Sequence, residues 1–196
     1  MQVLKEEVRN NILKAAIGEF RENGFKNSSM RNIAKRSGMT VGNLYRYFDN
    51  KEDLFYTIVN PTFNKMKEVI NDEEISLHGK DGKNYIAQQV TKRIIEINEE
   101  YRDELLIIIN GSEGTKFASA KKEFLELVER RIKGLLDKIE KIGLSIDSDF
   151  ISKIIATTYV EGVLLILNTF EDSDRINEEI ELYAKFTFKD IVNRFK

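Results

Sequence analysis

Apolar residues recur at intervals of three and four along most of the chain, the spacing that gathers side chains on one face of an α-helix. Before Asn23 this stripe contains Ile12, Leu13, Ala16, Ile17 and Phe20. Comparable stripes occupy residues 54–60, 63–70, 85–99, 100–110, 117–142, 149–170 and 174–195. The pattern predicts an all-α protein in which the polar residues 72–84 form a surface connection.

Short signals divide the first 53 residues into three helices. Gly24 follows the first stripe and can adopt the positive φ that ends a helix. Ser28 or Ser29 can cap the second helix, because a hydroxyl oxygen accepts from the free amides of a first turn. Gly38 then permits a sharp turn, and Thr40 is placed to cap the third helix. The expected unit is a helix-turn-helix.

The predicted third helix has an apolar side and a side suited to DNA. Leu44 and Phe48, four residues apart, would anchor it to the core. The same geometry turns Val41 and Asn43 outward. A major groove admits such a helix, in which Asn43 could bond base edges and Val41 could touch a thymine methyl group.

Two tyrosines of this stretch have two possible roles. The hydroxyls of Tyr45 and Tyr47 could reach DNA phosphates, or the rings could pack against neighbouring helices. Both interpretations stay open for Tyr45, and for Tyr47 we favour the phosphate contact.

Lys51 stands at the start of the fourth helix. Asn50 is a good N-cap with Asp53 three residues later, whereas a cation at this end opposes the helix dipole. A docked phosphate would make that cation favourable, because the free amides and the ammonium would hold the anion together. Alternatively, Lys51 is exposed to solvent and screened by Glu52 and Asp53.

A family resemblance rests on these residues. Leu-Tyr-x-Tyr-Phe-x-Asn-Lys-Glu-x-Leu, ending at Leu54, follows the turn at Gly38, and the Ile33-Ala34 pair and the Gly24-Phe25 break precede it. Residues 5–57 resemble the DNA-binding domain of the TetR family of bacterial regulators.

The resemblance implies a three-helix DNA-binding domain over residues 1–53 and a helical ligand-binding and dimerisation domain over residues 54–196. It implies contacts at or near the DNA backbone from Ser29, Arg31, Thr40, Tyr45, Tyr47 and Lys51, and base reading by Val41, Gly42 and Asn43. The sequence departs from the family at Val41, where a polar residue is common, and at Arg46, where an aromatic one is. These departures leave the operator sequence open.

The second domain is expected to sense a small molecule. Pro61 predicts a break or kink after Asn60, and this point is either a hinge or a tolerated kink. Judged from position, the candidate groups for an apolar or amphipathic effector are Phe63, Met66, Asn110, Phe117, Phe124, Thr158 and Glu161. Ligand binding would favour a spacing of the DNA-binding domains that fits the operator poorly.

The last two helices are apolar on more than one face, which predicts a second partner. A homodimer with two helices per subunit in a four-helix interface would supply it. The residues proposed for this interface are Tyr159, Val163, Ile166, Ile180, Tyr183 and Ile191. A two-fold dimer would need a roughly palindromic operator with half-sites about 34 Å or a multiple apart.

Charge and hydropathy limit the classes of protein to which the chain can belong. Residues 1–51 contain ten Lys or Arg and five Asp or Glu, although the whole chain carries a net charge of −2. The start of the chain lacks a signal-peptide pattern, and the apolar run 163–167 is short for a membrane span, so we expect a cytoplasmic protein.

Enzyme chemistry finds little support in the sequence. The chain has no Cys, and its one His, His78, has only Glu74 four residues away as a possible co-ligand, so neither a metal site nor a cofactor is predicted. The segment from Gly111 to Gly114 lacks the lysine of a phosphate loop and is interpreted as a helix connection. An all-helical enzyme and a DNA-binding module without ligand sensing are the competing hypotheses.

Overall fold

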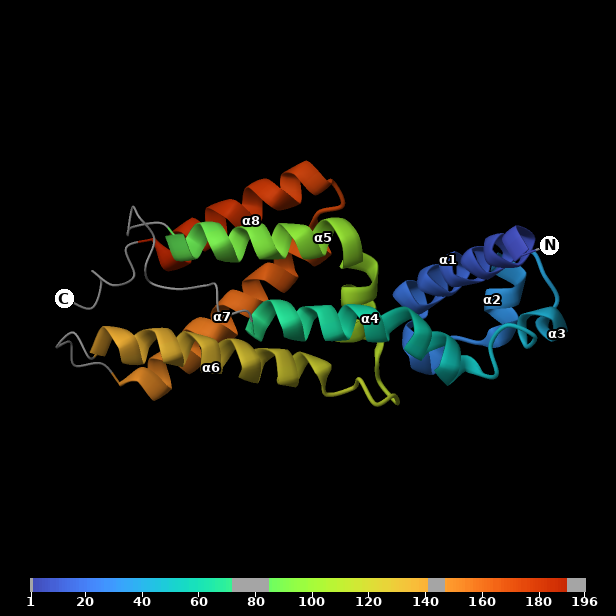
Figure 1. Cartoon of the computed structure of the whole chain (residues 1–196), viewed down its shortest axis with the longest axis horizontal. Helices are drawn as coiled ribbons and strands as arrows, with labels where there is room; N and C mark the ends of the chain where they lie inside the picture. The colour runs from blue at the N-terminus through green and yellow to red at the C-terminus, as the bar shows by residue number, and fades with distance from the viewer. Residues whose placement is uncertain (1, 72–84, 141–146, 190–196) are drawn as a thin grey trace. The chain divides into compact units, whose positions relative to one another are not determined.

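The structure, a computed structural model, describes residues 2–71, 85–140 and 147–189, and its regular elements there are α-helices. In chain order they are α1 (Gln2–Asn27), α2 (Met30–Arg36), α3 (Val41–Leu44), α4 (Lys51–Asn71), α5 (Tyr85–Gly111), α6 (Ala120–Glu140), α7 (Ser148–Thr169) and α8 (Ser173–Phe188) (Figure 1). The all-α prediction is confirmed.

Two compact units share these helices. We call Met1–Lys65 with Asp103–Lys121 the head unit, and Met66–Arg102 with Lys122–Lys196 the body unit. The first half of α4 and the end of α5 thus pack with the three N-terminal helices. The functional boundary expected at residues 53 and 54 stays a prediction.

The predicted turns of the head unit are present. Gly24 has φ 66° and ψ 170°, which interrupts α1 after Asn23 as expected, and Gly38 has φ 70°. The hydroxyl of Ser28 donates to the carbonyl oxygens of Gly24 at 2.6 Å and Glu19 at 3.2 Å, so it closes the turn from inside.

An aromatic cluster joins the end of α1, the start of α4 and the connection after α5. Phe55 makes edge contacts with Phe20 and Phe25, each with ring centroids 5.0 Å apart. The ring centroid of Phe117 lies 6.2 Å from that of Phe55 and 5.2 Å from that of Phe63. This cluster explains why residues 103–121 belong to the head unit.

Backbone packing supports the same attachment. A Cβ atom on Gly111 would lie 3.2 Å from the Cα atom of Gly24, closer than ordinary side-chain contacts. Arg21 is paired with Asp103 at 3.2 Å, and Lys26 is paired with Glu113 at 2.7 Å. Gly111 therefore permits an approach that a larger residue would obstruct.

Of the break or kink predicted at Pro61, the break is wrong, because α4 continues through this residue to Asn71. A proline removes one backbone donor, but Pro61 is exposed and the buried residues Val59 and Thr62 hold the helix on either side. Whether the site bends in function stays a prediction. The helices expected over 85–99 and 100–110 are both present within α5, which is kinked between them at Tyr101 (φ −136°, ψ 19°).

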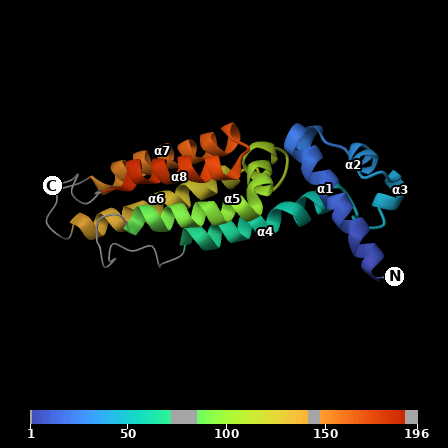
Figure 2. The same ribbon diagram turned by 90° about the horizontal axis from the view of Figure 1, so that it is seen from above.

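The body unit is built around α7. One buried cluster joins Tyr159 to Ala184 and Phe188, and another joins Ala156 to Ile132 and Leu136. α7 and α8 run side by side (Figure 2). Their approach is close at Gly162, where an added Cβ atom would lie 2.5 Å from the Tyr183 ring.

Candidate DNA-binding site

Two hydroxyl caps set the helix-turn-helix geometry. The Oγ atom of Ser29 accepts from the backbone N–H of Asn32 at 3.1 Å, and Oγ1 of Thr40 accepts from that of Asn43 at 3.2 Å. Both predicted caps are confirmed. Because each hydroxyl uses its oxygen for the cap, its O–H remains chemically able to donate to a phosphate.

The short helix α3 is anchored from one side. Leu44 is fully buried and Phe48 nearly so, as the four-residue spacing predicts. On the other side Gly42 and Asn43 are exposed, and Val41 is half-buried. The three residues expected to read bases thus share one short element with an open face.

The two tyrosines differ in exposure. Tyr45 is 47% exposed, whereas Tyr47 is half-buried. Such exposure is unusual for a ring whose role is core packing, and it favours the phosphate interpretation of Tyr45. Arg31 on α2 and Arg46 after α3 are also exposed, so they add positive charge to the surface of the head unit.

Lys51 makes contacts that neither sequence-based interpretation included. Its Nζ atom donates to the carbonyl oxygens of Phe25 at 2.7 Å and Ser28 at 2.9 Å, and lies 4.2 Å from the centre of the Phe25 ring. The ammonium thus ties the start of α4 to the chain between α1 and α2. An ammonium has three N–H groups, so one is left for a phosphate.

A buried carboxylate fixes α2 on α1. Glu19 is 1% exposed, and its carboxylate accepts from Arg36 Nε at 2.9 Å and from Asn32 Nδ2 at 2.9 Å. Arg36 also bonds Glu22, and this hydrogen bond lowers the pKa of Glu22 and raises that of Arg36. Sequence reasoning missed this network, because its members are 13 and 17 positions from Glu19 and follow no local motif.

The seven residues proposed for the effector site are divided between the two units. Phe63 and Phe117 meet in the head unit, whereas Phe124 is buried in the body unit. Met66 is half-buried on α4, and Thr158 and Glu161 are exposed on α7.

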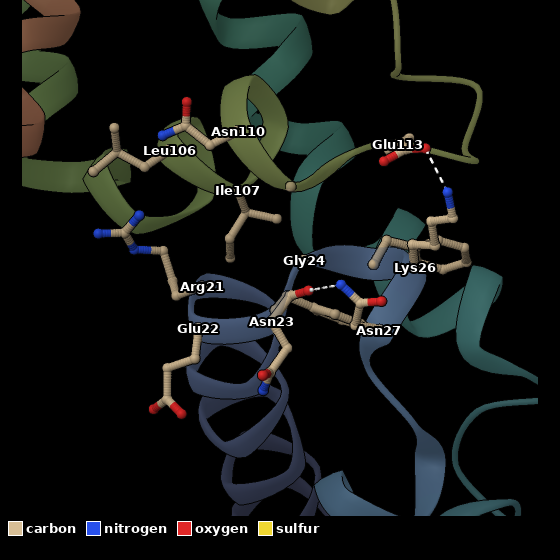
Figure 3. A pocket seen from close by; sticks show the side chains of 13 residues that line it. Arg21, Glu22, Asn23, Gly24, Lys26, Asn27, Leu106, Ile107, Asn110 and Glu113 are labelled. Atoms are coloured by element: carbon tan, nitrogen blue, oxygen red, sulfur yellow. Dashed lines mark hydrogen bonds and ion pairs between the residues drawn. The ribbon is translucent and has the colours of Figure 1, made fainter.

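Asn110 lies elsewhere, beside a hollow of about 260 Å³ in the head unit (Figure 3). Lys26 and Glu113 form an ion pair at its edge, and polar side chains of α1 supply much of the remaining lining. Apolar residues of α5, Leu106 and Ile107, complete the lining.

The possible metal pair of Glu74 and His78 lies outside the described residues. In the described residues, no group of three or more His, Asp or Glu side chains could hold a metal ion.

Residues 12–57 match the family model described as bacterial regulatory proteins, tetR family. Over these residues the chain is similar to the TetR family of transcriptional regulators. The matched residues include all nine predicted DNA contacts. Members of this family are DNA-binding regulators rather than enzymes.

Similarity extends over the rest of the chain. The transcriptional regulator QacR of Staphylococcus aureus is 28% identical over 191 residues, which cover 92% of this chain and 94% of QacR. The chain spans only 30–43% of the length of three other curated regulators that it matches.

Two solved structures share the fold. SCO3833 of Streptomyces coelicolor A3, a TetR-family member, has a TM-score of 0.71 at 16% identity and covers 90% of this chain and 89% of its own. The SmeT–triclosan complex has a TM-score of 0.57 at 22% identity and covers 95% of this chain and 94% of its own.

Proposed function

We propose that this protein is a TetR-family regulator that binds a palindromic operator as a homodimer, represses transcription from it, and is released by a small apolar or amphipathic ligand. The observation that carries the DNA-binding mode is the geometry of α3, whose buried Leu44 leaves Gly42 and Asn43 exposed on the other side. A helix held in this way can enter a major groove without losing its own packing.

The proposed contacts divide by role. Ser29, Arg31, Thr40, Tyr45, Tyr47 and Lys51 would bind the backbone, and Val41, Gly42 and Asn43 would read bases. Phosphate contacts supply affinity that falls with salt, whereas base contacts supply discrimination between sequences. Lys51 would contribute one N–H while its other bonds hold α4 in place.

The dimer interface is best placed on the outer faces of the last two helices. Several large apolar side chains are exposed there: Phe150, Ile154 and Leu165 on α7, and Leu182 and Phe186 on α8. Positions 150, 154 and 165 share one face of α7, and 182 and 186 share one face of α8. Phe186 is 74% exposed, a large cost to a monomer in water.

The interface set chosen from sequence periodicity selects the inward stripe of the same helices. Tyr159 and Ile180 are buried within the body unit, and Val163 and Tyr183 pack against its cluster. Ile166 is half-buried, and Ile191 lies outside the described residues. We therefore base the proposed dimer on the exposed residues instead.

The outward apolar face also accounts for the composition of α7. Among the described helices it is the one long and apolar enough to cross a membrane by length and composition, with a mean hydropathy of 1.7. A helix that packs inward on one side and against a second subunit on the other has the same composition. A cytoplasmic dimer is the simpler proposal.

Ligand release is the remaining element of the proposal. SmeT, which shares the fold, has a structure in complex with triclosan, a small molecule. In this chain the body unit would hold the effector, and the head unit would respond through the three chain segments that cross between the units.

Fluorescence anisotropy tests the DNA-binding proposal with DNA from immediately upstream of the gene and scrambled DNA, at two salt concentrations. We expect tighter binding to the upstream DNA and a marked loss of affinity at the higher salt concentration.

Sedimentation of the wild-type chain and of Phe186→Glu tests the dimer, and only the variant should be monomeric. A monomeric wild type, or equal binding to both DNAs followed by failure to select any preferred genomic fragment, would contradict the proposal.

A further inference from the structure

Two neighbouring side chains of α5 carry buried hydrogen-bonding atoms that no group in the described part of the protein satisfies. Asn98 is 4% exposed, and neither its Nδ2 nor its Oδ1 atom has a partner. Nε of Arg102, four residues later and just after the kink at Tyr101, is also buried and unpartnered. Buried polar atoms in proteins nearly always have partners, because leaving them unpaired costs stability.

The positions of these atoms follow from their neighbours on α5. Ile94 packs against the Tyr159 cluster, and Nη2 of Arg102 donates to the carbonyl oxygens of Leu167, at 2.9 Å, and Phe170. Residues 94 and 98 are four positions apart and both precede the kink at Tyr101, so they share one helix face. Asn98 therefore lies on the side of α5 that packs, at Ile94, against the cluster of α7 and α8 residues.

Ile94 and Val163 are both partly buried and apolar, and both pack against this cluster. The side of α5 that carries Asn98 therefore faces apolar surface.

The unpartnered atoms define a chemical complement. The side-chain amide of Asn98 offers one donor and one acceptor side by side, which match the cis amide edge of a lactam or a primary carboxamide in two parallel hydrogen bonds. The carbonyl oxygen of that edge has a second lone pair, which can accept from Nε of Arg102.

We propose that Asn98 and Arg102 are the polar anchor of the effector site and select a neutral, mostly apolar molecule that carries a lactam or primary carboxamide edge. This inference rests on the proposed function in taking the body unit to be the effector-binding unit. The ligand enters between α5 and α7, where it replaces apolar contacts around Ile94 and Val163.

A neutral ligand fits better than a carboxylate. Arg102 already serves the carbonyl groups at the end of α7, and the negative end of a helix dipole disfavours an added anion. A carboxylate also has no hydrogen to give to Oδ1 of Asn98. An amide edge satisfies both atoms of the asparagine.

The test uses two probes that differ by one group, 6-pentylpiperidin-2-one and δ-decalactone. Both have the same ring size and alkyl chain, but the lactam has an N–H where the lactone has an oxygen. We expect the full-length wild-type protein to bind the lactam about tenfold more tightly in ligand-observed NMR titrations, because the lactone leaves Oδ1 of Asn98 unpaired. Asn98→Leu should reduce the ratio to near one.

A second substitution controls for the removal of a buried polar group. Tyr159→Phe deletes another unpartnered atom of the same interior but leaves the amide of Asn98, so the lactam preference should persist. Asn98→Leu should also melt at a higher temperature than the wild type without ligand, which shows that the variant folds.

Three results would overturn the proposal: no binding of the lactam to the wild type, equal binding of lactam and lactone, or a preference that survives in Asn98→Leu. Operator binding is measured on the same preparation without probes. Tight operator binding together with any of these results would reject the ligand class alone, whereas loss of operator preference in the wild type would reject the proposed function.

Discussion

The interiors of the head and body units treat buried polar groups differently. In the head unit, the carboxylate of Glu19 and the hydroxyls of Ser28 and Ser37 are all hydrogen-bonded. Every unpartnered buried side-chain atom in the described residues lies in the body unit, including those of Asn98 and Tyr159. A satisfied network holds one geometry, whereas an unsatisfied one leaves free energy for a ligand to recover.

This difference suits the proposed division of labour. A helix that reads base edges must keep its position on the core, and the pairing of Glu19 with Arg36 fixes the helix that precedes it. A unit that changes state on ligand binding needs interactions that differ between its states. The substitutions below test whether the contrast is energetic as well as geometric.

The largest effect is expected when the buried network of the head unit is broken. Glu19→Ala removes the acceptor of Arg36 and Asn32, and we expect a loss of about 3 kcal/mol in the free energy of unfolding, together with weaker operator binding. Urea denaturation and anisotropy measure the two effects. The control is Glu22→Ala, which removes the exposed partner of Arg36 and should change stability much less than Glu19→Ala does. Equal effects of the two substitutions would contradict the assigned role of Glu19.

The contact between α7 and α8 tests how tightly the body unit is packed where it is apolar. Gly162→Ala would place a methyl group against the Tyr183 ring, and we expect a loss of about 2 kcal/mol in urea denaturation. Gly134→Ala on α6 meets no atom within 4 Å and should stabilise the protein by about 0.5–1 kcal/mol. If Gly162→Ala proved neutral, the close packing of these helices would not be the source of rigidity in this unit.

Substitution of Lys51 tests whether this residue holds α4 in position as well as contacting DNA. Lys51→Ala removes two hydrogen bonds to backbone carbonyls, so we expect a loss of about 1–2 kcal/mol in stability as well as weaker DNA binding. Arg31→Ala should weaken binding to all sequences and reduce the salt slope by about 1 without changing stability. Unchanged stability in Lys51→Ala would show that its contacts with Phe25 and Ser28 are energetically unimportant.

Local features of the head unit are predictable from the sequence, because each depends on neighbours a few residues away. The positive φ at Gly24, the cap at Thr40 and the anchor at Leu44 are of this kind. The bonds from Lys51 to Phe25 and Ser28 span more than twenty residues, and no periodicity specifies such pairs.

The body unit shows a second limit of sequence reasoning. α7 is apolar on both sides, so periodicity could not distinguish the inward Tyr159 from the outward Leu165. Pro61 misled the prediction for another reason, because packing on either side of an exposed proline can compensate for the donor it removes.

The smallest effect is expected from a comparison of two buried hydroxyls, one with hydrogen-bond partners and one without. Ser28→Ala in the head unit removes bonds to two backbone carbonyls, and we expect it to cost about 1 kcal/mol. Tyr159→Phe in the body unit should be neutral or slightly stabilising, because the deleted hydroxyl has no partner in the protein. Burial raises the pKa of Tyr159 well above its usual value, so this hydroxyl keeps its proton at neutral pH and the comparison involves no change of charge. Thermal and urea denaturation of both variants measure the difference. A loss of stability on Tyr159→Phe as large as that on Ser28→Ala would mean that buried polar groups are hydrogen-bonded equally well in both units. That result would remove the energetic basis for an effector bound between α5 and α7.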